Sequence, residues 1–406
     1  MKQATESSTA LNQPIPAAAV PLLSLAAFAS AISARVTDPL LPNLSGEFGM
    51  SLGDASNVIT FFSVAYGLSQ LFFGPLGDRY GKYVVVACAS IGCALTAALC
   101  AIAPNFQLLL AARLLAGATA GALIPLSMAW IGDVVPYQQR QPVLARFLVG
   151  QIFGLSMGAF FGGVAGDTFG WRFPFFGIAF IFLVIGIMLL ALNRRLPAHA
   201  RLIHKAEGAA IPRMVREFRQ VLAKPWARII LLTVVLEGAF LYGAFAFIAT
   251  HLHNTFGMSL TASGAMVMLY GFGGLLFAAA SGAFVNRLGE VGLSLWGGLV
   301  VAGSLLAVGV APVWWWAIPG CFFAGLGFYM LHNTLQTNAT QMAPERRGAA
   351  VSSFACSFFI GQSVGVAVAG AMVERAGTAA VIVVGAIGVL AVALNFTRRL
   401  KSKARG

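Results

Sequence analysis

The chain has 406 residues, of which 59% are hydrophobic and only 10% charged, and its formal net charge is +13. So few charged side chains could not cover the surface of a soluble protein of this size, which excludes an ordinary soluble domain. A positive net charge can indicate nucleic-acid binding, but the basic residues gather on one side of the predicted membrane segments, so we expect no nucleic-acid partner.

Nearly uncharged windows of about 20 residues recur along the whole chain, and each is long enough to cross a hydrocarbon layer of roughly 30 Å. They predict an all-α membrane protein with twelve transmembrane helices. The predicted spans are 18–43, 55–77, 83–103, 107–133, 143–167, 173–193, 228–251, 259–285, 292–311, 313–341, 349–373 and 377–397.

Basic residues indicate which side of the membrane each loop faces. Arg172 and Arg375 lie in loops on one side, whereas Arg79, Lys82 and most other basic residues outside the spans lie on the opposite side. The positive-inside rule makes this basic side cytoplasmic, and an even number of spans then places both termini there. We therefore predict an integral protein of the bacterial inner (plasma) membrane.

One long polar stretch divides six predicted spans from six. The predicted parts are a cytoplasmic tail (1–17), a first six-helix bundle (18–193), a basic cytoplasmic linker (194–227), a second six-helix bundle (228–397) and a basic cytoplasmic tail (398–406). Within the linker, Arg213, Arg216 and Arg219 recur every three residues. This spacing fits a short amphipathic helix on the inner membrane surface, and a solvated tether remains the alternative.

One pattern occurs twice in the chain, and a single offset relates most of its positions. The matched positions are 74–81 with 282–289, Pro104 with Pro312, Gly117 with Gly325, Pro136 with Pro344 and, at an offset one residue shorter, Gly154 and Gly158 with Gly361 and Gly365. A duplication of this length in an apolar chain predicts two homologous membrane bundles, an arrangement typical of secondary transporters.

The loop between the second and third predicted spans contains Gly74, Asp78, Arg79, Gly81 and Lys82. A glycine, an aspartate–arginine pair, a second glycine and a basic residue resemble the signature loop of the major facilitator superfamily. The twelve spans, the central linker and the weaker second copy of the loop extend this resemblance to the whole chain. The resemblance implies the major facilitator fold, in which two pseudo-symmetric six-helix bundles face each other.

The residues of this loop suit a conformational latch at the cytoplasmic surface. The glycines permit a sharp turn and close approach of helices. Asp78 can cap a neighbouring helix N-terminus, and Arg79 can pair with Asp133 at the end of the fourth span. Such a cluster would hold the cytoplasmic side closed when the protein faces outward, and Asn286, which replaces the aspartate in the second copy, predicts a weaker latch. A solvated turn is the alternative.

Three charged residues inside the spans are candidates for proton coupling, since a charge within a membrane is costly and usually functional. Arg113, followed by Gly117 and Gly121, resembles the superfamily's fourth-helix motif, in which a buried arginine is linked to proton coupling. Arg35 and Asp38 lie on one helix face, and Asp38 is expected at a depth similar to that of Arg113. Drug–proton antiporters of the superfamily often carry an acid before a proline at this position, which implies that Asp38 carries the proton.

Each of these assignments has a structural alternative. Arg113 could snorkel to the outer membrane surface, which lies only about 10 Å away by helix rise. Arg35 and Asp38 could form an intrahelical pair that serves folding alone. Proton coupling at Asp38 is therefore a hypothesis that substitution of this residue tests.

Glu237 is the only acid deep in the second bundle, and no basic residue is obvious at its depth. It could bind a cationic substrate or carry a second proton. Polar and aromatic residues within the spans could line a central cavity with it, although each is equally suited to an interhelical hydrogen bond. These candidates for substrate binding are Tyr66, Gln70, Gln151, Tyr242, Tyr270, His332, Asn333, Gln336 and Gln362.

The fifth span contains Gly154, Gly158, Gly162 and Gly163, a small-residue pattern that allows close helix packing. It resembles the superfamily motif associated with antiporters. Ala159 stands where the family pattern has proline, so the implication of antiport is weakened without being removed.

Several other functions find no support in the sequence. There is no phosphate-binding loop and no catalytic-triad or metal-hydrolase spacing, so we expect neither ATP-driven transport nor an enzyme. The five cysteines lie within predicted spans without metal-ligand spacing, which predicts free buried thiols and no metal site. We expect no cofactor, since the proton gradient would drive transport.

These observations predict a secondary transporter that exports a small organic compound, drug-like or metabolite, in exchange for protons by alternating access. We expect a monomer whose partners are a small-molecule substrate, protons and membrane lipid. One alternative is a proton symporter or facilitator that imports a sugar or an organic acid, whose carboxylate the intramembrane arginines would bind. Another is a non-transporting sensor or lipid-handling protein on the same fold.

Overall fold

A computed structural model of the chain describes residues 15–201 and 210–403. Residues 1–14 of the predicted N-terminal tail, 202–209 of the predicted linker and 404–406 of the predicted C-terminal tail lie outside them. Within the described residues every regular element is a helix, which confirms the all-α prediction.

The first bundle contains several spans that are interrupted by short breaks. Its elements are α2 (Ala19–Arg35), η1 (Asp38–Leu40), α3 (Leu41–Phe48), α4 (Leu52–Ala55), α5 (Asn57–Tyr80), α6 (Lys82–Ala101), α7 (Phe106–Ala120), α8 (Leu123–Val134), α9 (Tyr137–Thr168) and α10 (Phe173–Asn193). The first predicted span thus consists of α2, η1 and α3, and the fourth consists of α7 and α8.

The linker contributes η2 (Ala198–Arg201) and α11 (Ala210–Ala223), so part of it is helical. The second bundle consists of α12 (Pro225–Phe245), α13 (Ile248–Phe256), α14 (Leu260–Val310), η3 (Trp314–Trp316), α15 (Ala317–Gln341), η4 (Pro344–Arg346) and α16 (Arg347–Lys403). Ion pairs attach the linker region to this bundle: Lys224 binds Glu345, and Arg346 Nη1 lies 3.6 Å from Glu217 Oε1.

Ten helical segments of the described chain are long and apolar enough to cross a membrane. Two of them, of 51 and 60 residues, are about twice as long as a membrane of roughly 30 Å requires. Gly289 (φ 60°) and Gly377 (φ 78°) interrupt these two helices in the left-handed region that favours glycine. Each long helix therefore turns there and crosses twice, and the described residues fit the twelve predicted spans.

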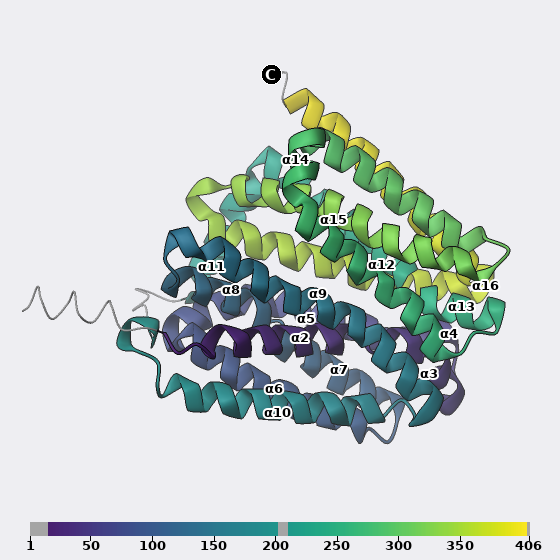
Figure 1. The fold of residues 1–406 in the computed structure, drawn as a ribbon, viewed down its shortest axis with the longest axis horizontal. Helices are drawn as coiled ribbons and strands as arrows, with labels where there is room; N and C mark the ends of the chain where they lie inside the picture. Colours follow the sequence, from purple (N-terminus) through teal and green to yellow (C-terminus); the bar gives the residue numbers. More distant parts are fainter. Residues whose placement is uncertain (1–14, 202–209, 404–406) are drawn as a thin grey trace, which may run out of the picture.

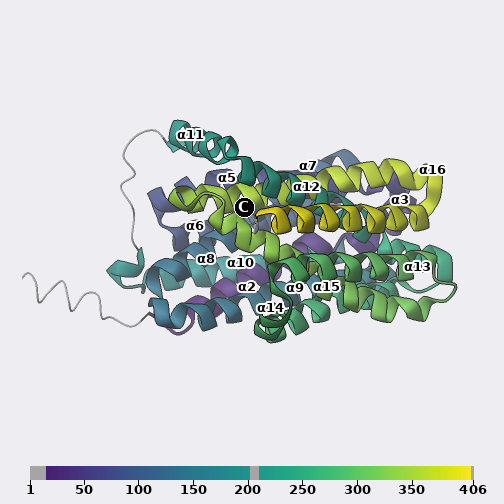
Figure 2. The same cartoon turned by 90° about the horizontal axis from the view of Figure 1, so that it is seen from above.

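The two bundles lie side by side with their helices running in roughly the same direction, the first from purple to teal and the second from teal to yellow (Figure 1). We call one end of the helices the basic end; it carries Arg79, Lys82, Arg287 and the linker. The other, the opposite end, carries the turns at Gly170 and Gly377. Figure 2 shows α11 on the outside of the helices towards the basic end.

The duplication read from the sequence is repeated in the helix contacts. A Cβ added to Gly154 would lie 2.3 Å from the carbonyl oxygen of Phe28, and one added to Gly361 would lie 2.1 Å from that of Val235. Gly361 follows Gly154 in the sequence by the same number of residues as Val235 follows Phe28. Glycine is required at such positions because the backbones touch, so the first helix of each bundle packs on the fifth in the same register.

The expected packing motif follows the same face of α9. Gly158 lies against the carbonyl oxygen of Ile32 and Gly162 against that of Val36, whereas Gly163 reaches across to the carbonyl oxygen of Leu260 in the second bundle. The motif therefore positions α9 both within its own bundle and against the other one.

We expect Gly365→Ala to destabilise the protein. The added Cβ would lie 2.1 Å from the carbonyl oxygen of Ala239, and overpacking of this kind costs about 1–3 kcal/mol. The melting temperature in detergent should therefore fall. Gly282→Ala is the matched control, since its added Cβ meets nothing within 4 Å and alanine favours helix, so its melting temperature should hold or rise. Equal melting temperatures would contradict the packing register.

Candidate functional site

The break in the first span positions its buried acid. α2 ends at Arg35, and Pro39, which has no backbone N–H to donate, follows Asp38 in the short helix η1. The turn directs Asp38 into the protein, where the residue is 1% exposed. One carboxylate oxygen, Oδ1, is buried without a hydrogen-bond partner among the described residues. A buried acid with one free oxygen is a chemically suitable proton acceptor.

Arg35 connects this acid to the second bundle. Its Nη1 lies 3.4 Å from Asp38 Oδ2, and its Nη2 donates to Gln362 Oε1 at 3.4 Å. The guanidinium carbon stands 4.0 Å from the ring centroid of Tyr242, close enough for a cation–π contact. Gln362 in turn donates to Ser63 Oγ of the first bundle at 2.8 Å, so the bundles are joined in both directions. We call Arg35, Asp38, Gln362 and Tyr242 the central cluster.

Arg113 is fully buried and bonded to the backbone. Its Nε donates to the carbonyl of Val58 at 3.1 Å and its Nη1 to that of Ser33 at 3.0 Å, and its guanidinium carbon stands 4.1 Å from the Phe62 ring centroid. Complete burial argues against a snorkelling side chain. Among the residues that the structure describes, no ion pair joins Arg113 to Asp38. Arg113 is therefore held by backbone carbonyls rather than by this acid.

Glu237 has a partner that the sequence did not reveal. His332 Nδ1 lies 2.8 Å from Glu237 Oε2, although no basic residue was expected at this depth. The sequence could not predict this pairing because the two residues belong to helices α12 and α15, whose relative register cannot be seen in a single sequence. The second oxygen, Glu237 Oε1, is buried without a hydrogen-bond partner in the described part of the chain.

Aromatic rings connect this pair with the central cluster. The imidazole of His332 stacks on Phe328 at 4.8 Å and lies 4.7 Å from Phe358. Phe358 also contacts the Tyr242 ring edge-on at 5.4 Å between centroids. Phe328, Phe358 and Ser63 were not expected from the sequence, in which phenylalanine and serine are common and carry no distinguishing pattern.

The remaining candidates are only partly drawn together. The hydroxyls of Tyr242 and Tyr270 lie 3.4 Å apart, and the Tyr66 ring lies 4.3 Å from that of Phe359 across the bundle interface. Within residues 15–201 and 210–403, four others make no side-chain hydrogen bond to the central cluster or to the Glu237–His332 pair. They are Gln70, which is buried, Gln151 and Asn333, which are half-buried, and Gln336, which is exposed.

The predicted latch is assembled around a different cation from the one expected. Lys82 Nζ lies 2.5 Å from Asp133 Oδ2 and 3.4 Å from Asp78 Oδ1, whereas the Arg79 guanidinium lies over the ring of Tyr80. Lys82 follows the turn at Gly81 (φ 93°), which brings its side chain back over Asp78. Gly74 borders open space and makes no close helix contact. All these contacts are internal to the first bundle.

Hydrogen bonds between the bundles are confined to one half of the molecule. In addition to the contacts of Gln362, Ser363 Oγ donates to the carbonyl of Thr60 at 3.2 Å, and others follow at the opposite end. Within the described ranges, no side-chain hydrogen bond between the bundles lies nearer the basic end than Gln362. The bundles are thus held together from the middle to the opposite end.

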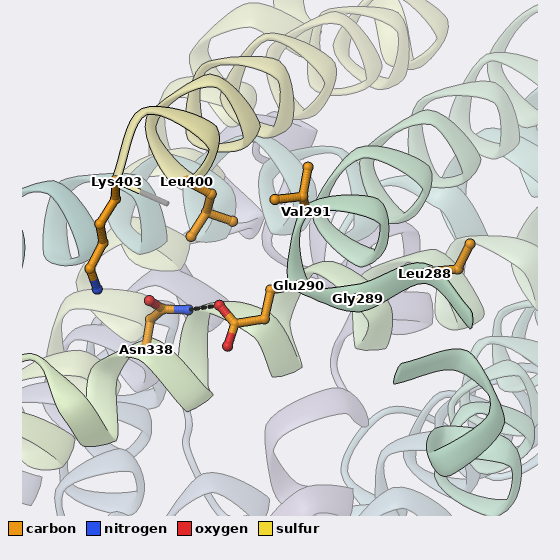
Figure 3. A pocket seen from close by; sticks show the side chains of 7 residues that line it. All are labelled: Leu288, Gly289, Glu290, Val291, Asn338, Leu400 and Lys403. Carbon is orange, nitrogen blue, oxygen red and sulfur yellow. Dashed lines mark hydrogen bonds between the residues drawn. The ribbon is translucent and has the colours of Figure 1, made fainter. Parts of the chain in front are cut away.

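A pocket at the basic end lies outside the predicted site (Figure 3). It has a volume of about 360 Å³ and belongs to the second bundle alone. Asn338 Nδ2 donates to Glu290 Oε2 at 3.1 Å beside it, and Lys403 extends towards this pair. No residue of the central cluster lines it, so it contributes nothing to the site between the bundles.

Comparisons with known proteins agree with this architecture. The family profile described as Major Facilitator Superfamily matches residues 23–355. The uncharacterized MFS-type transporter YwfA of Bacillus subtilis is 27% identical over 92% of this chain and 90% of its own length. The multidrug export protein EmrB of Escherichia coli is 30% identical over 38% of this chain and 30% of its own length. The crystal structure of a mutant of the nucleoside transporter NupG has a TM-score of 0.77 and 14% identity, covering 93% of this chain and 98% of that one.

We expect Arg113→Met to destabilise the first bundle. It would remove the two hydrogen bonds that the buried guanidinium donates to the carbonyls of Val58 and Ser33, and hydrogen bonds to charged groups contribute about 1.5–3 kcal/mol each. The melting temperature in detergent should fall by several degrees. Arg79→Met, at an exposed position, is the control and should melt like the parent protein. If Arg113→Met melts like its control, the two carbonyl contacts do not hold the helices together.

Proposed function

The chain belongs to the major facilitator superfamily, and we propose that it exports a small organic compound in exchange for protons. It is an integral membrane transporter rather than an enzyme. Its orientation follows from its charges: the positive-inside rule places the basic end in the cytoplasm, at the inner membrane of a bacterium. The half in which the bundles are bonded together then faces outward, and substrate would enter from the cytoplasm.

The contact of Arg35 with both bundles is the observation that carries this proposal. Ionised Asp38 holds the guanidinium, whereas protonated Asp38 offers it no charge. Because Arg35 also contacts Gln362 and Tyr242, the protonation state of Asp38 alters the attraction between the bundles. A cationic substrate bound among these side chains would compete with Arg35 for the Asp38 carboxylate. Such mutual influence between two ligands is the free-energy coupling that exchange requires.

Glu237 and the rings around it suggest the chemistry of the substrate. Among the described residues, one carboxylate oxygen has no hydrogen-bond partner, and Phe328, Phe358 and Tyr242 stand close by. An apolar body with one cationic or hydrogen-bonding group would match these features. The relative EmrB is a multidrug export protein, which is in keeping with such a substrate class.

Import of an organic acid finds less support. That alternative needs an arginine free to bind a carboxylate. Arg113 already donates to two backbone carbonyls and has no exposed surface, and Arg35 is occupied by Asp38 and Gln362. We therefore propose no second function.

Asp38→Asn should abolish proton exchange. The amide cannot be ionised, so the grip on Arg35 would no longer change with proton binding. Inverted vesicles with an acidic interior and a pH-sensitive dye should show proton release when lipophilic cations are added, for the parent protein only. Sugars and organic acids complete the panel. Asp54→Asn, which changes an acid outside the central cluster, should behave like the parent. Unchanged proton release by folded Asp38→Asn would contradict the assignment of Asp38 as the proton carrier.

Glu237→Gln should weaken transport of cations selectively. The amide oxygen can still accept from His332, but the negative charge is lost, so the KM for a cationic substrate should rise about tenfold. The KM for a neutral compound of similar shape should change little. Uptake of both radiolabelled compounds into inverted vesicles provides the comparison. An equal effect on both compounds would show that Glu237 supports the fold rather than binding the cation.

A further inference from the structure

The last turn of α9 completes the first turn of a helix in the other bundle. Asp167 Oδ1 accepts the backbone N–H of Leu260 at 3.0 Å, and its Oδ2 accepts that of Thr261 at 2.7 Å. Ser259 Oγ accepts the N–H of Ala262, next in the same turn. These N–H groups lack partners within α14, and a carboxylate is favoured there because a helix N-terminus carries partial positive charge.

The second bundle makes the reverse contact. Glu374, near the end of the first crossing of α16, accepts the N–H of Gly53 through its Oε1 at 2.6 Å. Ser51 Oγ accepts the N–H of Asp54 in the same turn, as Ser259 does in α14. The backbones touch as well, since a Cβ added to Gly53 would lie 2.3 Å from the carbonyl oxygen of Gly370.

The duplication relates these two contacts to each other. Asp167 and Glu374 are separated by the shorter of the two repeat offsets, the one that relates α9 to α16. Gly163, which touches Leu260, precedes Gly370 by this same offset. Thr261 follows Gly53 by the longer offset, which relates α14 to the second span. An acid and a glycine one helical turn before it therefore make the same contact twice, once in each direction across the interface.

We propose that Asp167 and Glu374 form a two-point clamp that holds the opposite end closed. Each carboxylate belongs to one bundle and bonds backbone of the other, so neither bond can survive separation of the bundles at this end. The pseudo-twofold relation means that one rocking motion breaks both together. They are positioning residues for the transport cycle. The inference rests on the alternating access in the proposed function but on neither its proton nor its substrate.

The other two acids at this end serve a different purpose. Glu47 binds Arg172 and Trp171, and Asp54 bonds Ser51, all within the first bundle. Their removal changes the local charge without touching the interface. Asp54→Asn is therefore a matched control for the loss of a carboxylate at this end.

Thiol labelling of a buried position tests the clamp. Ser363 lies behind it at the bundle interface and is 6% exposed. In a Ser363→Cys background, a membrane-impermeant maleimide is added on the side of the opposite end, without substrate or proton gradient. Charged hydrogen bonds are about twice as strong as neutral ones, so Asp167→Asn with Glu374→Gln should raise the labelling rate roughly tenfold. Asp54→Asn should leave it unchanged.

Two further measurements keep the result unambiguous. The native thiol Cys321 is 1% exposed inside the second bundle and must stay unlabelled if the protein is folded. Should the double variant fail this check, the single variants carry the test, each with an expected rise of about threefold, and Asp167→Asn should have the larger effect because Asp167 accepts two N–H groups. An unchanged rate at Cys-substituted position 363, with Cys321 protected, would overturn the clamp. If the proton-exchange assay fails while the labelling rates change as expected, the clamp is still supported and only the proton coupling is contradicted.

Discussion

This structure depends on the contact between the Arg35 guanidinium of the first bundle and polar and aromatic side chains of the second. Arg35 is 4% exposed, and a charge so far from water must find compensation within the protein. Asp38 supplies part of it from the same span, and Gln362 and Tyr242 supply the rest from the second bundle. The bundles therefore cannot separate here without changing the environment of a buried acid.

The two bundles themselves are built to move as units. Their hydrophobic cores form two large clusters that divide mainly along the bundle boundary. Within each bundle, glycine contacts such as Gly154 on Phe28 and Gly361 on Val235 bring backbones into direct contact, which resists deformation. Between the bundles, the polar contacts of the described residues are few and lie in one half of the molecule. Rigid bundles with a sparse polar interface suit rocking about a central site.

The architecture was predictable because it is a matter of length, hydropathy and repetition. The positive-φ glycines Gly289 and Gly377, which divide the two longest helices, lie at or close to the boundaries expected between spans. The partners of individual charges were harder to predict. Asp133 binds Lys82 rather than Arg79, since the turn at Gly81 decides which cation returns to the helix ends, and a single sequence does not contain that geometry.

Contacts between distant helices were the least accessible to sequence reasoning. Glu237 and His332 are 95 residues apart, and nothing in one chain reveals their common depth. Asp167 and Glu374 resemble ordinary acids at span ends, although the repeat offset would have paired them.

The central claim is that protonation of Asp38 acts on the bundle interface. Spin labels at positions 79 and 287, which are equivalent exposed sites at the basic end, would report the separation of the bundles there. The distance between the labels is measured by double electron–electron resonance after replacement of the exposed Cys88. The distance distribution should shift between neutral and acidic pH in the parent protein and stay constant in Asp38→Asn. The same shift in both proteins would contradict the account.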